Sequence, residues 1–182
     1  IIWIDNVFLL TAIDTGKVDP KLTAPKDQPE RPFGITYPNT VHQYVVLCLD
    51  RASGKEKWRQ VAAERGPNEG HHGDNSFASC SPTTDGQRLY AWFCGAGLHC
   101  YDLKGKPLWQ RDFGDVNTRL SFGEGASPVF YQDKIIVTRD CEDQSYVVVV
   151  DAHNGETVWR SERDEPSGWS TPIVVFHKGK HQ

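Results

Sequence analysis

The chain of 182 residues lacks methionine, lacks an apolar run long enough to cross a membrane, and lacks a basic cluster. Its formal net charge is −4, and without a basic cluster this balance argues against nucleic acid as a partner. No window keeps the spacing of apolar residues that a helix requires. We therefore expect an all-β protein with no membrane-spanning segment.

Cysteine is scarce and carries no recognisable pattern. The five cysteines stand at 48, 80, 94, 100 and 141, with no Cys-x-x-Cys spacing and no adjacent pair. An odd number without such spacing indicates neither a disulfide scaffold nor a zinc site. We expect most of them to be small buried side chains.

The chain does contain one short phrase three times: an apolar strand, an aspartate, a small turn ending in glycine, and a tryptophan. The copies are Asp50, Gly54 and Trp58; Asp102, Gly105 and Trp109; and Asp151, Gly155 and Trp159. Their tryptophans are 51 and 50 residues apart. A second marker, Ser81-Pro82, Ser127-Pro128 and Thr171-Pro172, recurs with prolines 46 and 44 apart. Two markers in phase indicate a repeat architecture.

Each repeat reads as four short strands joined by turns, which describes one blade of a β-propeller. Asn154-Gly155 between two apolar runs predicts a type I′ hairpin turn, in which both central residues have positive φ. We expect each tryptophan to fill the gap between neighbouring blades. We expect each aspartate to accept hydrogen bonds from backbone N–H groups of its turn. Both are structural roles.

The repeat phase divides residues 1–182 into units of one partial propeller domain. The expected blades are residues 1–66, with an insertion at about 15–40, then 67–114 and 115–164; residues 165–182 begin the first strand of a further blade. We interpret the chain as a fragment, about three blades plus a stub, of a propeller with seven or eight blades.

The phrase Asp-x-x-Ser/Asn-Gly-x-x-x-Trp after an apolar strand resembles the tryptophan-docking motif of the pyrrolo-quinoline quinone (PQQ) repeat family of quinoprotein-like propellers. The resemblance covers residues 41–182 well. The family includes quinoprotein alcohol dehydrogenases and the bacterial outer-membrane protein assembly factor BamB. Membership implies a periplasmic or other extracytoplasmic location, and it specifies the fold more strongly than any one activity.

In a four-stranded meander the loops between the second and third strands and the connections between blades emerge on the same face. The long segments of this chain all fall on that face. Long loops on one side of a rigid scaffold are where binding sites usually lie. Among them, His71, His72 and Asp74 could hold a transition metal or calcium, with a hydrogen-bonded loop as the alternative. Asn75 and Glu124 lead into first strands and would point toward the central funnel, where quinoprotein dehydrogenases hold PQQ and Ca²⁺. The alternative is that these groups close the blade-to-blade turns. Arg119 could balance Glu124.

Two functions follow from the resemblance. The first is a non-catalytic binding or scaffold module of the cell envelope, with a protein or polysaccharide partner on the long-loop face. The alternative is an alcohol or sugar dehydrogenase that depends on PQQ and Ca²⁺, with Asn75, Glu124, Arg119 and Trp169 near the quinone. The chain has no adjacent cysteine pair to cap a quinone and no clear catalytic base, which favours the first function.

Overall fold

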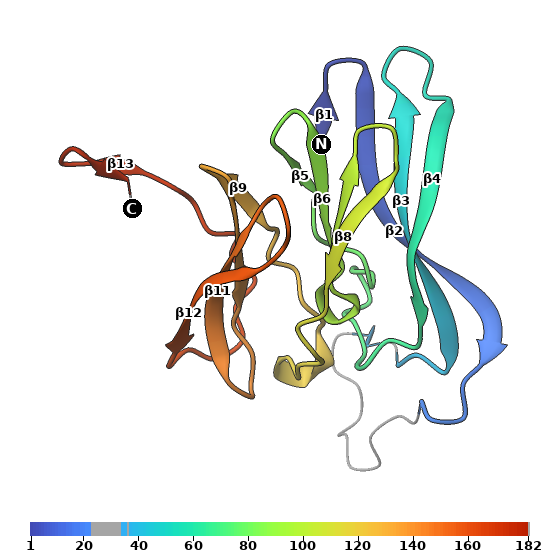
Figure 1. The fold of residues 1–182 in the computed structure, drawn as a ribbon. Helices are drawn as coiled ribbons and strands as arrows, with labels where there is room; N and C mark the ends of the chain where they lie inside the picture. Colours follow the sequence, from blue (N-terminus) through green and yellow to red (C-terminus); the bar gives the residue numbers. More distant parts are fainter. Residues whose placement is uncertain (23–33, 36, 182) are drawn as a thin grey trace.

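A computed structural model describes residues 1–22, 34–35 and 37–181, and these residues form three four-stranded antiparallel sheets and a small hairpin (Figure 1). The first sheet holds β1 (Ile2–Trp3), β2 (Asn6–Val18), β3 (Thr40–Asp50) and β4 (Glu56–Arg65). The second holds β5 (Thr83–Thr84), β6 (Arg88–Trp92), β7 (Leu98–Asp102) and β8 (Pro107–Arg111). The third holds β9 (Val129–Tyr131), β10 (Lys134–Arg139), β11 (Ser145–Asp151) and β12 (Thr157–Arg163).

Each sheet keeps its strands in chain order, as a meander does, and the sheets stand side by side as propeller blades (Figure 1). The all-β prediction and the four-stranded blades are confirmed. The hairpin of β13 (Phe176–His177) and β14 (Lys180–His181) follows the third blade. No helix among the described residues is long and apolar enough to cross a membrane.

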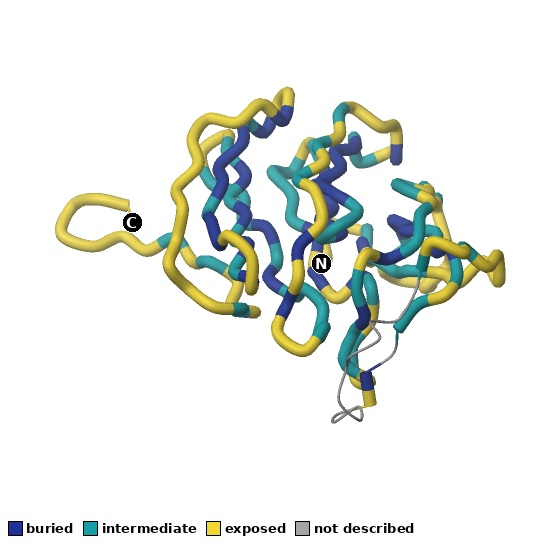
Figure 2. Tube along the Cα trace, turned by 90° about the horizontal axis from the view of Figure 1, so that it is seen from below, coloured by how far each residue is buried: buried dark blue, intermediate teal, exposed yellow. Residues whose placement is uncertain are grey.

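The hydrophobic core lies between the blades (Figure 2). Strand β6 shows how one strand serves two cores, because its side chains alternate between the two faces of the sheet. Leu89 and Ala91 pack toward the first blade, whereas Tyr90 and Trp92 pack toward the third. All four are fully buried.

Two of the three repeated tryptophans, Trp58 and Trp109, join neighbouring blades, as predicted. Trp159, in the third blade, is 48% exposed. Trp58 Nε1 donates to Leu103 O at 3.2 Å, and Trp109 Nε1 donates to Ala152 O at 3.1 Å. A Cβ added to Gly105, which has φ +87°, would lie 2.8 Å from the Trp58 ring. Glycine is therefore required at this position for two reasons: its φ is positive, and the Trp58 indole leaves no space for a Cβ.

The repeated aspartates hold the three turns of the motif, and Trp58 and Trp109 contact two of these turns. Asp102 Oδ1 accepts from the backbone N–H groups of Lys104 and Lys106, both at 2.9 Å. Asp50 Oδ1 accepts from Ser53 N at 2.9 Å, and Asp151 Oδ1 accepts from His153 N at 2.7 Å. The predicted role of the aspartates is confirmed.

One sequence prediction about local structure is wrong. Asn154-Gly155 is not a type I′ turn, because Gly155 has a positive φ and Asn154 does not. The hairpin closes instead with the Asp151 N–H bonded to Glu156 O, which leaves a four-residue loop. Within the insertion expected at about 15–40, residues 15–18 belong to β2, and residues 23–33 and 36 lie outside the described part of the chain.

Candidate functional site

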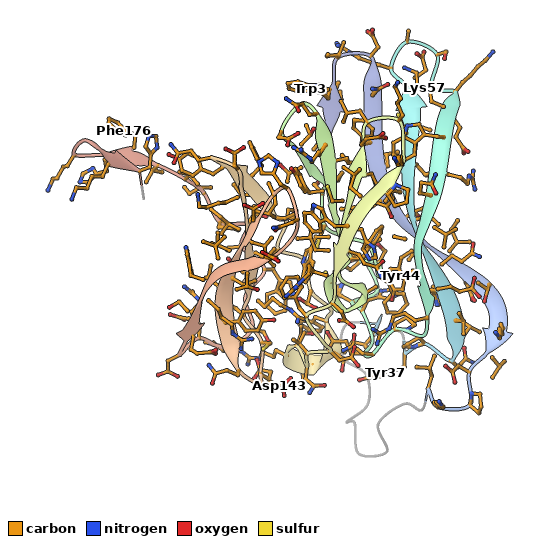
Figure 3. All side chains as sticks on the ribbon, viewed as in Figure 1. Trp3, Tyr37, Tyr44, Lys57, Asp143 and Phe176 are labelled. Carbon is orange, nitrogen blue, oxygen red and sulfur yellow. The ribbon has the colours of Figure 1, made fainter. Side chains whose placement is uncertain are left out.

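The blades have two edges that differ in construction. The turn edge carries the short turns 51–55, 85–87, 103–106 and 152–156. The loop edge carries a first loop (residues 66–82), a connecting loop (residues 112–128, joining β8 to β9) and a third loop (residues 164–175). Figure 3 shows Trp3 and Lys57 at the turn edge and Asp143 at the loop edge.

At the loop edge, polar contacts tie the first loop, and Arg65 at the end of β4, to the connecting loop. The Glu69 carboxylate accepts from Thr118 N and from Thr118 Oγ1, both at 2.9 Å. Asn68 Nδ2 donates to Val116 O at 2.7 Å, and Arg65 Nη2 donates to Asp115 Oδ1 at 2.7 Å. Burial raises the pKa of Glu69 to about 7.

The connecting loop is tied in turn to the third blade and to the third loop. Asn117 N donates to Asp143 Oδ2 at 2.8 Å. Arg119 N donates to Ser167 Oγ at 2.8 Å, and that hydroxyl donates to Glu142 at 2.7 Å. The connecting loop is thus hydrogen-bonded to the first loop, to Asp143 of the third blade and to the third loop. We call this hydrogen-bonded surface the braced loop edge.

Beneath this surface lies a buried ion pair. Arg139 is 2% exposed, and its Nη2 and Nε donate to the Glu124 carboxylate at 3.0 and 3.2 Å. The same guanidinium donates to Phe113 O at 2.8 Å and to Gly114 O at 3.1 Å. Burial by itself would lower the pKa of Arg139, but the adjacent Glu124 carboxylate raises it above its usual range. Arg139 therefore fixes the connecting loop from below.

A small cavity of about 30 Å³ lies between the first loop and the connecting loop. Its wall includes Glu69, His71, Phe93, Cys94 and Glu124. This volume holds about two water molecules, since one water needs at least about 10–15 Å³ of such space. The cavity is lined by two carboxyl groups, an imidazole and a thiol.

The histidine cluster does not assemble a metal site among the described residues. No group of three or more His, Cys, Asp or Glu side chains gathers anywhere in that part of the chain. His71 Nδ1 lies 2.7 Å from His72 O and its ring stands edge-on to Phe77. His72 Nδ1 lies 3.8 Å from Asp74 Oδ2, whose side chain is 97% exposed. The arrangement matches the hydrogen-bonded loop that was the alternative; the metal site stays a prediction.

Of the four residues expected near a quinone, Glu124 lines the cavity, whereas Asn75, Arg119 and Trp169 do not. Glu124 lines the cavity, but its partner is Arg139 and not Arg119, which is exposed. Asn75 accepts a hydrogen bond from Ser79 Oγ within its own loop. Trp169 Nε1 donates to Gly123 O at 2.7 Å, and its ring is tilted against Phe122 at 6.1 Å.

These residues do not present a donor set that fits a quinone with calcium. A cation at Glu124 would have to displace the guanidinium of Arg139, which already neutralises that carboxylate. The side-chain oxygen of Asn75 is engaged within its loop. The structure does bring His71, His72 and Trp169 together, around residues 122–124 of the connecting loop.

Sequence reasoning missed Arg139 and Glu69. Arg139 could have been found, because Ile135, Val137 and Arg139 alternate along β10 and all three are buried. An arginine in phase with two apolar core residues indicates a buried ion pair. Glu69 had no such signal, since its partner Thr118 lies 49 residues away in another irregular loop.

The tip of the connecting loop exposes an apolar side chain from a strained backbone. Leu120 has φ 55° and ψ 21°, in the left-handed region that leucine rarely adopts, and it is 40% exposed. The turn is held by Ser121 N donating to Thr118 O at 2.9 Å and by Gly123 N donating to Thr118 Oγ1 at 2.9 Å. Trp169, on the third loop, is also 40% exposed.

Solved structures similar to this chain include both enzymes and assembly factors. BamB from Moraxella catarrhalis is 12% identical, with a TM-score of 0.43 over 70% of this chain and 34% of that one. Quinohemoprotein alcohol dehydrogenase from Comamonas testosteroni is 17% identical, with a TM-score of 0.46 over 87% of this chain and 23% of that one. Quinohemoprotein alcohol dehydrogenase ADHIIG from Pseudomonas putida HK5 is 19% identical, with a TM-score of 0.44 over 67% and 19%.

The chain spans about a fifth to a third of the length of these structures. No curated protein sequence matches it. The sequence pattern of the family described as outer membrane protein assembly factor BamB matches residues 42–179, which is most of the chain. Together with the three blades and the docked Trp58 and Trp109, this match shows that the chain belongs to the PQQ-like, BamB-like propeller family.

Proposed function

We propose that this chain is part of a non-catalytic propeller of the cell envelope, which helps to assemble outer membrane proteins by binding a protein partner at its loop edge. The observation that carries the proposal is the braced loop edge, in which three loops interlock around the connecting loop. A surface that is already ordered loses little conformational entropy on binding. The name of the matching family supports the role in assembly.

The exposed residues of that edge support a protein partner. Leu120 and Trp169 are large and apolar, and each is 40% exposed. A strained backbone that displays an apolar side chain costs about 1–2 kcal/mol, and such strain is concentrated at functional sites. The polar groups beside them are engaged with one another, which suits a rigid docking surface better than a catalytic centre.

The proposal is tested by photo-crosslinking in the cell envelope of the source organism. A photoreactive residue replaces Leu120 at the loop edge, and a matched variant carries it at Ser53 on the turn edge, which is also exposed. We expect one discrete crosslinked protein from position 120 and none from position 53. Equal crosslinking at both positions, or none at position 120, overturns the loop edge as the docking surface.

The second arm tests the biological role and the enzymatic alternative. Deleting the gene should lower the amount of folded outer membrane proteins, and Leu120→Asp should restore it less well than the wild type. Full-length protein supplied with PQQ and Ca²⁺ should reduce no electron-accepting dye across a panel of alcohols and sugars. Substrate-dependent dye reduction would replace the scaffold proposal with the dehydrogenase.

A further inference from the structure

Two of the five cysteines touch. Cys80 Sγ lies 3.2 Å from Cys94 Sγ, and both are free thiols in this structure. Cys80 stands just before β5, and Cys94 begins the short turn η2 (Cys94–Ala96) after β6. The contact therefore joins the two ends of the hairpin that opens the second blade.

Both sulfur atoms are held in place by the chain around them. Cys94 has φ 56°, a left-handed conformation that is uncommon outside glycine. Its turn is fixed by Gly97 N donating to Cys94 O at 2.9 Å and by Phe93 N donating to Gly97 O at 2.9 Å. The Cys80 thiol donates to Ala126 O at 3.3 Å. These bonds aim the two side chains at one another.

We propose that Cys80 and Cys94 form a disulfide bond that links the entry of the second blade to the wall of the loop-edge cavity. The sulfur atoms need to approach by only about 1 Å to reach bonding distance. Cys94 lines the cavity, whereas Cys80 is buried in the core between the second and third blades. The bond would close a loop of 15 residues, counting both cysteines. This inference does not depend on the proposed function.

The third blade provides a comparison within the molecule. The residue before Ser81-Pro82 is Cys80, and the residue before the matching Ser127-Pro128 is Ala126. The third blade therefore has no sulfur at this position. The second blade carries a pair of thiols that the repeat does not require.

The chemistry needs a two-electron oxidant, for which we take a low-molecular-weight disulfide such as oxidised glutathione. The thiolate of Cys94, the less buried of the two, attacks one glutathione sulfur and releases the first reduced glutathione. The thiolate of Cys80 then attacks the Cys94 sulfur of the mixed disulfide and releases the second. Two protein thiols are oxidised, one glutathione disulfide is reduced, and the two protons end on the glutathione thiols.

The first attack is slow in the folded protein. The neighbouring Cys80 and burial both raise the pKa of Cys94, so little thiolate is present at neutral pH. The test therefore oxidises the protein while it refolds. Reduced full-length protein is unfolded, refolded with oxidised and reduced glutathione, alkylated under denaturing conditions, digested with trypsin and mapped by mass spectrometry.

Trypsin separates the two cysteines, because Arg88 lies between them. The expected product is peptide 66–88 joined to peptide 89–104, with Cys100 of the second peptide alkylated. Cys94→Ala should abolish the link, whereas Cys100→Ala, which removes another buried thiol of the same peptide, should leave it intact. Separate alkylation of all five cysteines overturns the proposal, and so does a link through Cys100.

Thermal unfolding gives a second measurement that does not depend on peptide mapping. Closing a loop of this size should raise the Tm of the oxidised full-length protein by about 3–5 °C over the reduced one. The shift should vanish in Cys94→Ala and persist in Cys100→Ala. A wild-type Tm that oxidation leaves unchanged, with the link present in the map, would show that the bond does not constrain the blade and would overturn its structural role.

Discussion

Asp50 at the turn edge and Glu69 at the loop edge are held in opposite ways. At the turn edge, hydrogen bonds from Ser53 lower the pKa of Asp50 to about 2, within one exposed and local turn. At the loop edge, burial raises the pKa of Glu69 to about 7, and its partner Thr118 comes from another blade. The turn edge repeats one local solution three times, whereas the loop edge is built once from long-range contacts.

The difference teaches where fold and function are encoded. The turns that receive the tryptophans can recur because each needs only its own aspartate, glycine and backbone N–H groups. The loop edge uses partners that no other blade repeats, such as Arg139 with Glu124.

Replacing Arg139 should damage the loop edge most. Arg139→Met leaves the Glu124 carboxylate buried without its partner and removes the donors to Phe113 O and Gly114 O. We expect a loss of about 3–5 kcal/mol in the free energy of unfolding, measured in urea. The control is Arg163→Met, which breaks a more exposed pair with Asp140 and should cost about 1 kcal/mol or less. Equal losses in the two variants would contradict the buried network.

The largest effect at the turn edge should come from Trp109. Trp109→Ala removes an indole packed on Gly155 and its bond to Ala152 O, so we expect a loss of about 3 kcal/mol. Leu108→Ala is the matched control, because Leu108 precedes it on β8 and is 44% exposed. An unchanged urea midpoint in Trp109→Ala would show that the tryptophan does not join the blades.

Glu69 should make stability depend on pH in the direction opposite to an ordinary surface carboxylate. Its pKa is raised from 4.5 to about 7, so the folded state holds the proton more tightly than the unfolded state. The contribution of Glu69 to the free energy of unfolding is greatest below pH 4.5 and is lost as the pH rises through 7.

Glu69→Gln should remove that dependence and stabilise the protein at pH 8 by about 2 kcal/mol relative to the wild type, a value reduced because the group is partly exposed. Unfolding free energies of both proteins at pH 5 and pH 8 provide the check. Parallel pH profiles would show that Glu69 ionises freely.

The smallest effect should come from a single turn aspartate. Asp102→Ala removes an acceptor from the N–H groups of Lys104 and Lys106, and we expect a loss of about 1 kcal/mol. Asp102→Asn keeps an acceptor oxygen and should lose less. If Asp102→Ala cost as much as Arg139→Met, the turn edge would not be the local structure described above.

The repeat made the turn edge predictable from sequence. Asp102, Gly105 and Trp58 occupy their expected places because the motif specifies backbone bonds and one packing contact, and both recur with the period. The type I′ turn at Asn154-Gly155 failed, since Asp151 and Glu156 close a longer loop. Two consecutive positive φ angles occur instead at Gln132 and Asp133, which lack the Asn-Gly or Asp-Gly sequence typical of a type I′ turn.

The loop edge was predictable in position but not in detail. Strand parity placed the long segments on one edge, yet the partner of Glu124 was expected to be Arg119 and is Arg139. Nothing in an irregular loop tells which distant residue will face it. Only residues on strands, such as Arg139 in phase with Val137, carry a pattern from which burial follows.

Strand β6 sends alternate side chains into both cores, so the second blade cannot loosen without weakening contacts on each side of it. Its five residues separate the two cores and pack into both, so opening one core also weakens the packing of the other. The blades are therefore coupled in their unfolding as well as in their packing, and a local disturbance in the middle sheet is transmitted to both neighbours.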